Sequence, residues 1–290
     1  MTISDARPVL HPVRECDAGA FSRFFTLCHA TGAPNILITL SAKIACPLSP
    51  LFCILLSTGR PCGAPLFPPP TTNGIAVQKE SDLRVELIDI CRKLAAKGLI
   101  AATDGNVSCR VGEDRLLITP SGTAKGDLRA VDLLLADLDG QVVAGATRPS
   151  SEIRMHLLAY RMRPDVRAVV HAHPPMLTAF TLAGVPFTAE ALPEVWLTIG
   201  RTPTAPYATP STDEVPDSIA GLVQDHQAIL LERHGSLTFG NNLREAYLRL
   251  EKLEHAAHTL FFARLLAGRP ASPLPGPALE KLARAFGRKN

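Results

Sequence analysis

The sequence predicts an α/β sandwich in which helices cover the faces of a β-sheet. Segments with apolar residues at helical spacing alternate with short apolar runs of strand length. An Asp-Gly pair at 139–140 separates two of these runs, as in a hairpin. Of the 290 residues, 46% are hydrophobic and 20% are charged, a balance that can fill a sizeable core.

The first half of this pattern begins with a helix. Ser81 is expected to cap it and Gly98 to end it. Its apolar positions at helical spacing are Leu83, Leu87, Cys91 and Leu94. Four short strands are predicted to follow, at 106–110, 115–119, 133–137 and 141–144, the last two joined through the Asp-Gly turn.

The second half contains longer helices between buried strands. Helices are predicted at 151–162, 175–183, near 213–224 and at 243–267, and strands at 168–173 and 228–232. No internal repeat is visible in the sequence. These elements form one patterned domain at 79–270, with a C-terminal tail at 271–290.

Residues 1 to 78 differ in composition from the rest. They hold 10 of the 25 prolines and only eight charged residues, and they show no sustained periodicity. We expect this extension to be poorly ordered. The alternative is that it is spurious because translation begins near Val77.

Charge and cysteine content exclude several classes of partner. The net charge is +3, and the 30 basic and 27 acidic residues are interspersed, so neither a nucleic-acid partner nor a membrane surface is predicted. The longest apolar stretch, 44–56, is too short to span a bilayer. Seven cysteines without CxxC spacing indicate no disulfide framework. The expected location is the cytoplasm.

Three histidines form a candidate metal site. His171 and His173 end an apolar strand, and residues two apart on a strand point to the same face. His234 ends a second apolar run. Three imidazoles with an open fourth position are typical of catalytic zinc. Taken alone, an HxH pair is more often structural than metal-binding.

Three turns are candidate anion sites. The segment 149–152 opens a helix with Pro-Ser-Ser-Glu, and helix N-termini bind phosphate. The glycine-containing turns 104–108 and 119–122 offer further backbone N–H groups. Each segment can also be purely structural, either a helix cap or an ordinary turn. Lys125 and Arg148 could assist in holding an anion. His156, on one helical face with Glu152, is expected to be structural.

In their order and spacing, these motifs resemble the class II aldolase/adducin superfamily, most closely its L-fuculose-phosphate aldolase branch. The resemblance covers about 80–268. Its pieces are Gly105-Asn106-Val107-Ser108, Ile118-Thr119-Pro120-Ser121-Gly122, Pro149-Ser150-Ser151-Glu152, Val170-His171-Ala172-His173, Ala205-Pro206-Tyr207-Ala208-Thr209 and Arg233-His234-Gly235.

The resemblance implies a three-layer α/β/α sandwich around a mainly antiparallel sheet, assembled as a homotetramer. It implies Zn²⁺ on His171, His173 and His234, with Glu152 as catalytic acid/base and a further metal ligand. Proton transfer by Glu152 favours a raised pKa, which a dry pocket would give and the adjacent cation would oppose. The phosphate-binding residues that it implies are Gly105, Asn106, Ser121, Gly122, Ser150 and Ser151.

The expected reaction is reversible cleavage of a small phosphorylated sugar, a ketose 1-phosphate, into dihydroxyacetone phosphate and a small aldehyde. The superfamily also contains pentose-phosphate 4-epimerases, a thioribulose-phosphate dehydratase and sugar-acid phosphate decarboxylases, and these stay open alternatives. A noncatalytic adducin-like domain is disfavoured, because such domains lack the zinc histidines and the acid. The stretch 186–197 lacks the tyrosine of the resembling aldolase, and Glu190 or Glu194 could replace it as proton donor.

Overall fold

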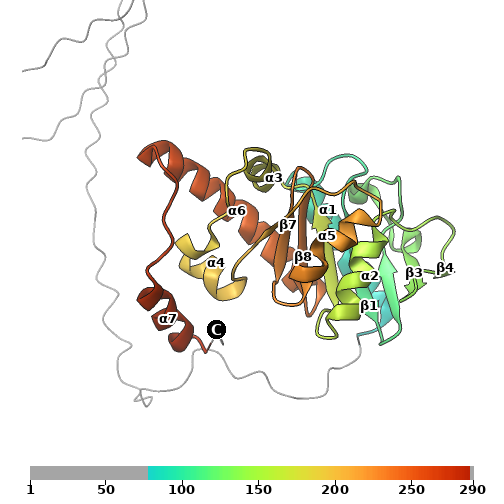
Figure 1. The fold of residues 1–290 in the computed structure, drawn as a ribbon. Helices are drawn as coiled ribbons and strands as arrows, with labels where there is room; N and C mark the ends of the chain where they lie inside the picture. The colour runs from blue at the N-terminus through green and yellow to red at the C-terminus, as the bar shows by residue number, and fades with distance from the viewer. Residues whose placement is uncertain (1–77, 288–290) are drawn as a thin grey trace, which may run out of the picture. The chain divides into compact units, whose positions relative to one another are not determined.

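The computed structural model describes residues 78–287. They form one eight-stranded sheet with helices on both faces, which confirms the predicted α/β/α sandwich (Figure 1). Apart from Gln78, the predicted N-terminal extension lies outside the described residues. Among residues 78–287, no helix combines the length and apolarity needed to cross a membrane.

The sheet is almost wholly antiparallel, as expected. Its strand order is β4-β3-β2-β1-β5-β8-β7-β6, and only the short edge pair β6–β7 is parallel. The bounds are β1 Asn106–Val111, β2 Arg115–Ile118, β3 Leu134–Asp137, β4 Val142–Ala144, β5 Ala168–Ala172, β6 Thr204–Ala205, β7 Ala228–Leu231 and β8 Gly235–Gly240. Strand β5 therefore lies at the centre, hydrogen-bonded to β1 on one side and β8 on the other.

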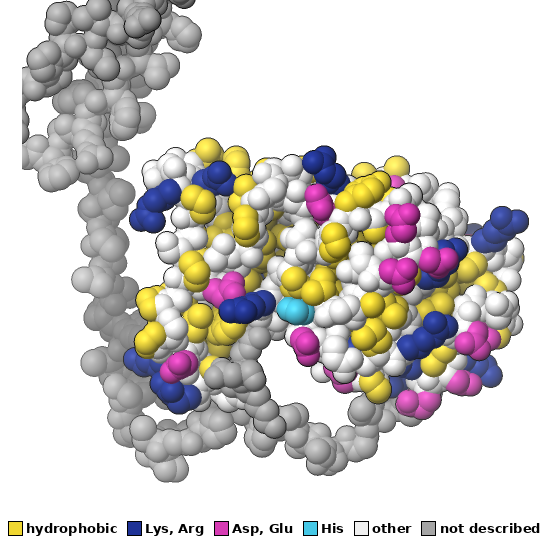
Figure 2. All heavy atoms as spheres, in the orientation of Figure 1, with side chains coloured by type: hydrophobic (Ala, Val, Ile, Leu, Met, Phe, Trp, Pro, Cys, Tyr) yellow, Lys and Arg dark blue, Asp and Glu magenta, His cyan; other side chains and the backbone are white. Residues whose placement is uncertain are grey.

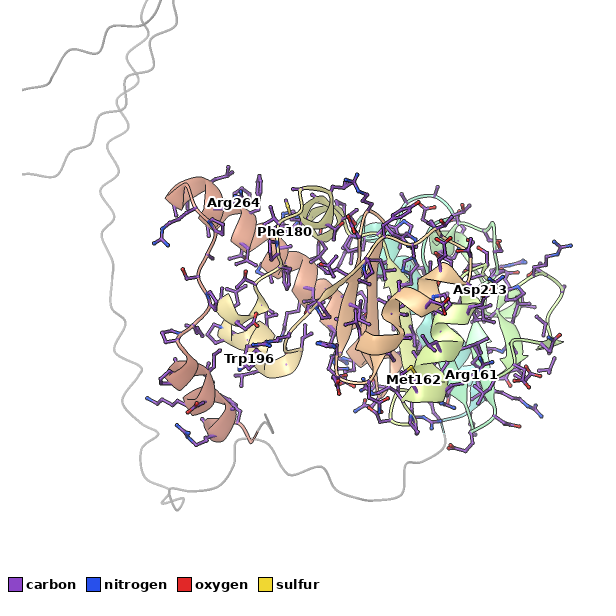
Figure 3. The ribbon with its side chains drawn as sticks, viewed as in Figure 1. Arg161, Met162, Phe180, Trp196, Asp213 and Arg264 are labelled. Atoms are coloured by element: carbon purple, nitrogen blue, oxygen red, sulfur yellow. The ribbon has the colours of Figure 1, made fainter. Side chains whose placement is uncertain are left out.

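Two helical layers cover the sheet. Helices α2 and α5 pack together on one face, whereas α1, α3 and α6 cover the other. In Figure 3, Phe180 marks α3 and Trp196 marks α4 near α6, while Met162 marks α2. The bounds are α1 Glu80–Ala96, α2 Ile153–Met162, α3 Pro175–Leu182, α4 Pro193–Thr198, α5 Glu214–Val223, α6 Leu243–Ala267 and α7 Gly276–Ala285.

The core divides into two clusters because side chains alternate across each strand. On β2, Leu117 packs with the layer of α1 and α6, whereas Leu116 and Ile118 pack with the layer of α2 and α5. On β5, Val170 and Val169 divide in the same way. Apolar residues on both faces explain why these central strands read as continuous apolar runs.

Two predicted helix starts are wrong. Helix α1 begins at Glu80, with Lys79 in the N-cap position, so Ser81 lies inside the first turn and caps nothing. Helix α2 begins at Ile153 with Glu152 in the N-cap position, two residues later than predicted. Ser150 and Ser151 consequently lie in the loop before the helix, where Oγ of Ser150 accepts the N–H of Glu152 and Oγ of Ser151 lies 2.7 Å from Oγ of Ser211.

Candidate metal centre

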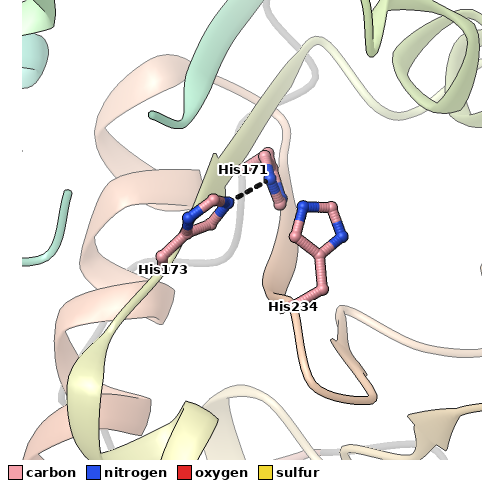
Figure 4. Close-up of side chains that lie close together, drawn as sticks. All are labelled: His171, His173 and His234. Atoms are coloured by element: carbon pink, nitrogen blue, oxygen red, sulfur yellow. Dashed lines mark hydrogen bonds between the residues drawn. The ribbon is translucent and has the colours of Figure 1, made fainter. Parts of the chain in front are cut away.

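The three candidate histidines come together at one end of the central strands. His171 lies near the end of β5 and His173 follows that strand directly. His234 lies in the short turn that joins β7 to β8, and the β5–β8 register pairs Ala172 with Ser236 beside that turn. As a result, one ring nitrogen of each histidine lies within 4.8 Å of the others (Figure 4).

One hydrogen bond and one close carboxylate lie on the outer sides of two of these rings. Nδ1 of the buried His171 lies 3.0 Å from the carbonyl oxygen of Ser236, and because a carbonyl only accepts, Nδ1 carries the proton. The lone pair of the neutral ring is then on Nε2. Nδ1 of His173 faces Asp104 Oδ2 at 3.5 Å, and its Nε2 lies 2.9 Å from Nε2 of His171. Both Nε2 atoms thus face one point, as metal-ligating histidines held by outer partners do.

Glu152 completes the cluster. Its Oε2 lies 3.3 Å from Nε2 of His171, and its Oε1 lies 3.1 Å from Nε2 of His234. Burial raises the pKa of Glu152, but His171 and His234 in their protonated forms outweigh burial and hold this pKa well below its usual range. Burial and a neighbouring positive charge therefore act on this pKa in opposite directions, as expected, and the positive charge has the larger effect. Burial, together with His171 and His234, lowers the pKa of His173 to about 4, so its ring is neutral at pH 7.

These groups fit a divalent metal ion. Two imidazole lone pairs 2.9 Å apart repel one another unless a proton or a cation lies between them. Oε1 of Glu152 is buried and makes no hydrogen bond of good geometry, although it lies close to His234. A bound cation would satisfy all of these atoms, and neutral imidazole nitrogen with carboxylate oxygen is a donor set that zinc accepts.

A glycine allows the strands to approach this closely. A Cβ atom on Gly235 would lie 2.8 Å from Cδ2 of His173 and closer still to the carbonyl oxygen of Ala172. Only a residue without a side chain lets the β7–β8 turn lie against the end of β5. Gly235 is thus a requirement for the position of His234.

The substitution Gly235→Ala is expected to weaken metal binding and to lower the free energy of unfolding by about 1–3 kcal/mol, since the added methyl group overlaps backbone. Denaturant unfolding and metal titration would measure the two effects. The matched control is Gly221→Ala, because Gly221 lies in α5 with open space around its Cα, and alanine there should stabilise by about 0.5–1 kcal/mol. Equal stabilities for the two variants would contradict the role given to Gly235.

The predicted anion turns lie next to one another. Pro120 and Pro149 form an isolated bridge, the N–H of Ser121 donates to the carbonyl of Arg148, and the N–H of Ser150 donates to the carbonyl of Thr119. This joins the turn 119–122 to the loop 148–151. Within them Ser121, Gly122 and Ser151 are exposed and Ser150 is buried.

A buried lysine connects the third turn to these two. Nζ of Lys125 donates to the carbonyl oxygens of Thr103, at 2.7 Å, and Thr123, at 2.8 Å. Burial lowers its pKa, while Asp104 and Glu152 act in the opposite direction. The turn that contains Gly105 and the loop after Gly122 therefore share one cationic anchor.

Asn106 is bound to the acid/base candidate. It is buried on β1, paired with His171 across the β1–β5 register. Its Nδ2 donates to Oε2 of Glu152 at 2.9 Å, and its Oδ1 lies 2.5 Å from Nε2 of His156. His156 is fully buried, as expected of a structural histidine four residues after Glu152.

The two alternative proton donors lie in the segment 189–198. Glu190, in the turn Ala189–Ala191, is paired with Arg201 at 3.0 Å, and Glu194 is exposed in α4. Their role stays a prediction.

On the face that Figure 2 shows, basic and acidic side chains are interspersed over the surface.

Comparisons with known proteins agree with this architecture. A 5-deoxy-D-ribulose 1-phosphate aldolase of Bacillus thuringiensis serovar kurstaki is 34% identical over 72% of this chain and 96% of its own. A 3-oxo-tetronate 4-phosphate decarboxylase of Escherichia coli K12 is 33% identical over 70% of this chain and 96% of its own. A solved L-fuculose 1-phosphate aldolase has a TM-score of 0.66 and 31% identity, and covers 73% of this chain and 99% of its own.

The family model described as class II aldolase and adducin N-terminal domain matches residues 85–261. That span contains the histidine cluster, Glu152 and the three turns. The resemblance drawn from the motifs is confirmed, and aldolases and decarboxylases among the relatives make the chain an enzyme of the lyase type. This chain belongs to the class II aldolase family.

Proposed function

We propose that this chain is a zinc-dependent aldolase that reversibly cleaves a ketose 1-phosphate into dihydroxyacetone phosphate and a small aldehyde. The observation that carries the proposal is the convergence of His171, His173 and His234 with the Glu152 carboxylate, next to three turns able to bind an anion. The Bacillus thuringiensis relative, named as an aldolase of a 1-phosphate ketose, supports it.

The histidines would hold the metal through the nitrogens that face one another, with Glu152 as a further ligand before substrate binds. When bound, zinc supplies a Lewis acid that polarises a carbonyl and stabilises developing negative charge. Glu152, a carboxylate at neutral pH because of its lowered pKa, acts as the base. It would accept the substrate's hydroxyl proton as the carbon–carbon bond breaks and give that proton to the carbon left with the electron pair, which yields dihydroxyacetone phosphate; in the reverse direction both transfers are reversed.

The three turns would bind the substrate's phosphate and so fix the sugar relative to Glu152. The exposed hydroxyl of Ser121 and the cation of Lys125 favour this role, and the exposed hydroxyl of Ser151, 2.7 Å from Oγ of Ser211, would have to exchange that contact for the phosphate. Asn106 can contribute its second amide N–H, since the first is donated to Glu152. The full phosphate-binding set is Gly105, Asn106, Ser121, Gly122, Ser150 and Ser151.

A sugar-acid phosphate decarboxylase is the second candidate. The Escherichia coli relative with that activity in its name is 33% identical, almost as similar as the aldolase. A 3-oxo acid phosphate offers the same combination of a carbonyl for the metal and a phosphate for the turns. The shared groups therefore support both reactions.

The proposal includes a cytoplasmic homotetramer formed by the domain at 79–270. Large apolar side chains are exposed on α6, with Leu265 at 64% and Leu266 at 90%, and exposed patches of this kind mark assembly surfaces. Light scattering on the purified protein would give the subunit number.

The test is a product assay with zinc-loaded protein. We expect L-fuculose 1-phosphate or 5-deoxyribulose 1-phosphate to release dihydroxyacetone phosphate, detected by coupled oxidation of NADH, and a chelator to stop the release. Carbon dioxide from 3-oxo-tetronate 4-phosphate without cleavage of either ketose would replace the aldolase by the decarboxylase. Inactivity on all three with metal bound would contradict both.

A further inference from the structure

A buried chain of four hydrogen bonds leads away from Glu152 into the core. Asn106 Nδ2 lies 2.9 Å from Oε2 of Glu152, and Asn106 Oδ1 lies 2.5 Å from Nε2 of His156. On the far side of the ring, Nδ1 of His156 lies 2.7 Å from Oγ of Ser108, which lies 2.7 Å from the hydroxyl of Tyr160. Asn106, Ser108, His156 and Tyr160 are each at most 2% exposed.

Regular secondary structure places all five side chains. Asn106 and Ser108 are two residues apart on β1 and share one face of the strand. His156 and Tyr160 lie four apart on one face of α2, and Glu152, the N-cap residue of that helix, precedes His156 by four. The chain forms where these two faces meet, so it depends on the docking of α2 against β1.

The direction of every hydrogen bond follows from Glu152. An ionised carboxylate only accepts, so the amide of Asn106 must present its NH₂ group there and its oxygen to His156. That oxygen also only accepts, so Nε2 of His156 carries a proton. In a neutral ring Nδ1 is then an acceptor, and it receives the hydroxyl proton of Ser108. Ser108 in turn accepts from Tyr160.

The neutral ring is a consequence of burial. Burial, reinforced by His171, lowers the pKa of His156 to about 3, with Glu152 acting weakly in the opposite direction. Burial also raises the pKa of the Tyr160 hydroxyl, so it stays protonated as the terminal donor. Each group in the chain therefore has one protonation state near pH 7 and one role.

The two oxygens of Glu152 are made unequal by this chain. Oε2 receives the N–H of Asn106, whereas Oε1 is buried beside His234 and makes no hydrogen bond of good geometry. We propose that His156 is a positioning residue for the reaction: its Nε2–H, held by Ser108 and Tyr160, locks the Asn106 amide so that Oε2 is restrained and Oε1 is left for proton transfer. The proposal rests on the proposed role of Glu152.

Two substitutions of His156 distinguish the contribution of Nε2 from that of Nδ1. In His156→Gln the longer side chain places its amide N–H near the position of Nε2 and still donates to Asn106. In His156→Asn the shorter amide takes the position of Nδ1, keeps the contact with Ser108 and loses the donor to Asn106. Both exchange a buried ring for an amide, so their costs in packing are similar.

We expect His156→Asn to lower kcat by about 100-fold, as misplacement of a catalytic group does, with zinc content nearly unchanged and a much smaller rise in KM, because Asn106 is only one of the proposed phosphate-binding residues. His156→Gln should recover most of this loss. A role in stability alone would reduce both variants together, in step with their melting temperatures, and that result would overturn the proposal.

A second measurement uses the unaltered full chain. Nitrogen-15 NMR of histidine-labelled protein should show the His156 ring neutral, with its proton on Nε2, throughout pH 6–8. A proton on Nδ1 or a charged ring would overturn the proposal even if the Asn variant fails to fold. Wild-type protein without lyase activity would overturn the proposed function and this role with it. Active wild type with an equally active His156→Asn would overturn only the positioning role.

Discussion

The substitution Glu152→Gln is expected to lower kcat by about 10²–10⁴-fold, the usual contribution of general acid–base catalysis. Glutamine keeps the size of the side chain, and its amide oxygen can still accept from Asn106 Nδ2. It cannot take up a proton, however, so the step assigned to the free oxygen of the carboxylate is lost. Steady-state kinetics on the ketose 1-phosphate that the wild type cleaves would measure the effect.

The metal must remain for this result to be interpretable. We expect zinc content close to that of the wild type, because the three histidines are untouched. The matched control is Glu113→Gln, a carboxylate that is 92% exposed, which should leave kcat unchanged. A Glu152→Gln variant with full activity would remove Glu152 from the mechanism. Zinc lost together with activity would instead make it chiefly a metal ligand.

The sequence predicted the fold well where local signals and burial agree. The long apolar faces of α1 and α6, and the continuous apolar runs of β5 and β7, predicted elements within one or two residues of those observed. Strand β8 was missed although Leu237 and Phe239 alternate with polar residues. It begins at Gly235, and only three residues separate it from the end of β7, so the sequence shows no clear turn between the two strands.

Short elements with weak local signals were also missed. Helix α4 is six residues long and begins with Pro193, and α7 lies within the predicted tail after several prolines. Both depend on contacts within the fold: α4 packs against α6 and α7 packs against α4. Such contacts join residues far apart in sequence, so no window of the sequence contains the reason for these helices.

In the candidate site too, features with a local sequence pattern were predicted, whereas contacts between distant segments were not. The pattern of His171 and His173 predicted two rings on one face, and the structure brings them to 2.9 Å. The partners that orient the rings, the Ser236 carbonyl and Asp104, come from other segments and were not predicted. His156 was expected to be structural, and its buried contacts with Asn106 and Ser108 of β1, which come from another segment, were likewise not predicted.

Of all the substitutions, removal of His171 and His173 should have the largest effect on zinc content and activity. In His171→Ala/His173→Ala a single imidazole and a carboxylate remain, too few to hold zinc tightly, since a catalytic site usually uses three protein ligands. We expect the wild type to contain about one zinc per chain and the variant close to none. Cleavage of the sugar phosphate should disappear with the metal. Elemental analysis of both dialysed proteins gives the result directly.

The control is a second pair of histidines in the same chain. His255 and His258 lie three apart on the exposed face of α6, a spacing that can also bind metal. The variant His255→Ala/His258→Ala therefore tests whether the loss of any two neighbouring histidines lowers the zinc content. This variant should keep both zinc and activity. Zinc retained in the first variant and lost in the second would move the metal site to α6.

Thermal unfolding distinguishes loss of metal from loss of fold. A ligand present at about 1,000 times its Kd stabilises the native state by about 4 kcal/mol, so a chelator should lower the melting temperature of the wild type by several degrees. The variant without His171 and His173 has no metal to lose, so its melting temperature should not respond to the chelator. If the chelator affects both proteins equally, the bound metal lies elsewhere and the histidines at the end of β5 have another purpose.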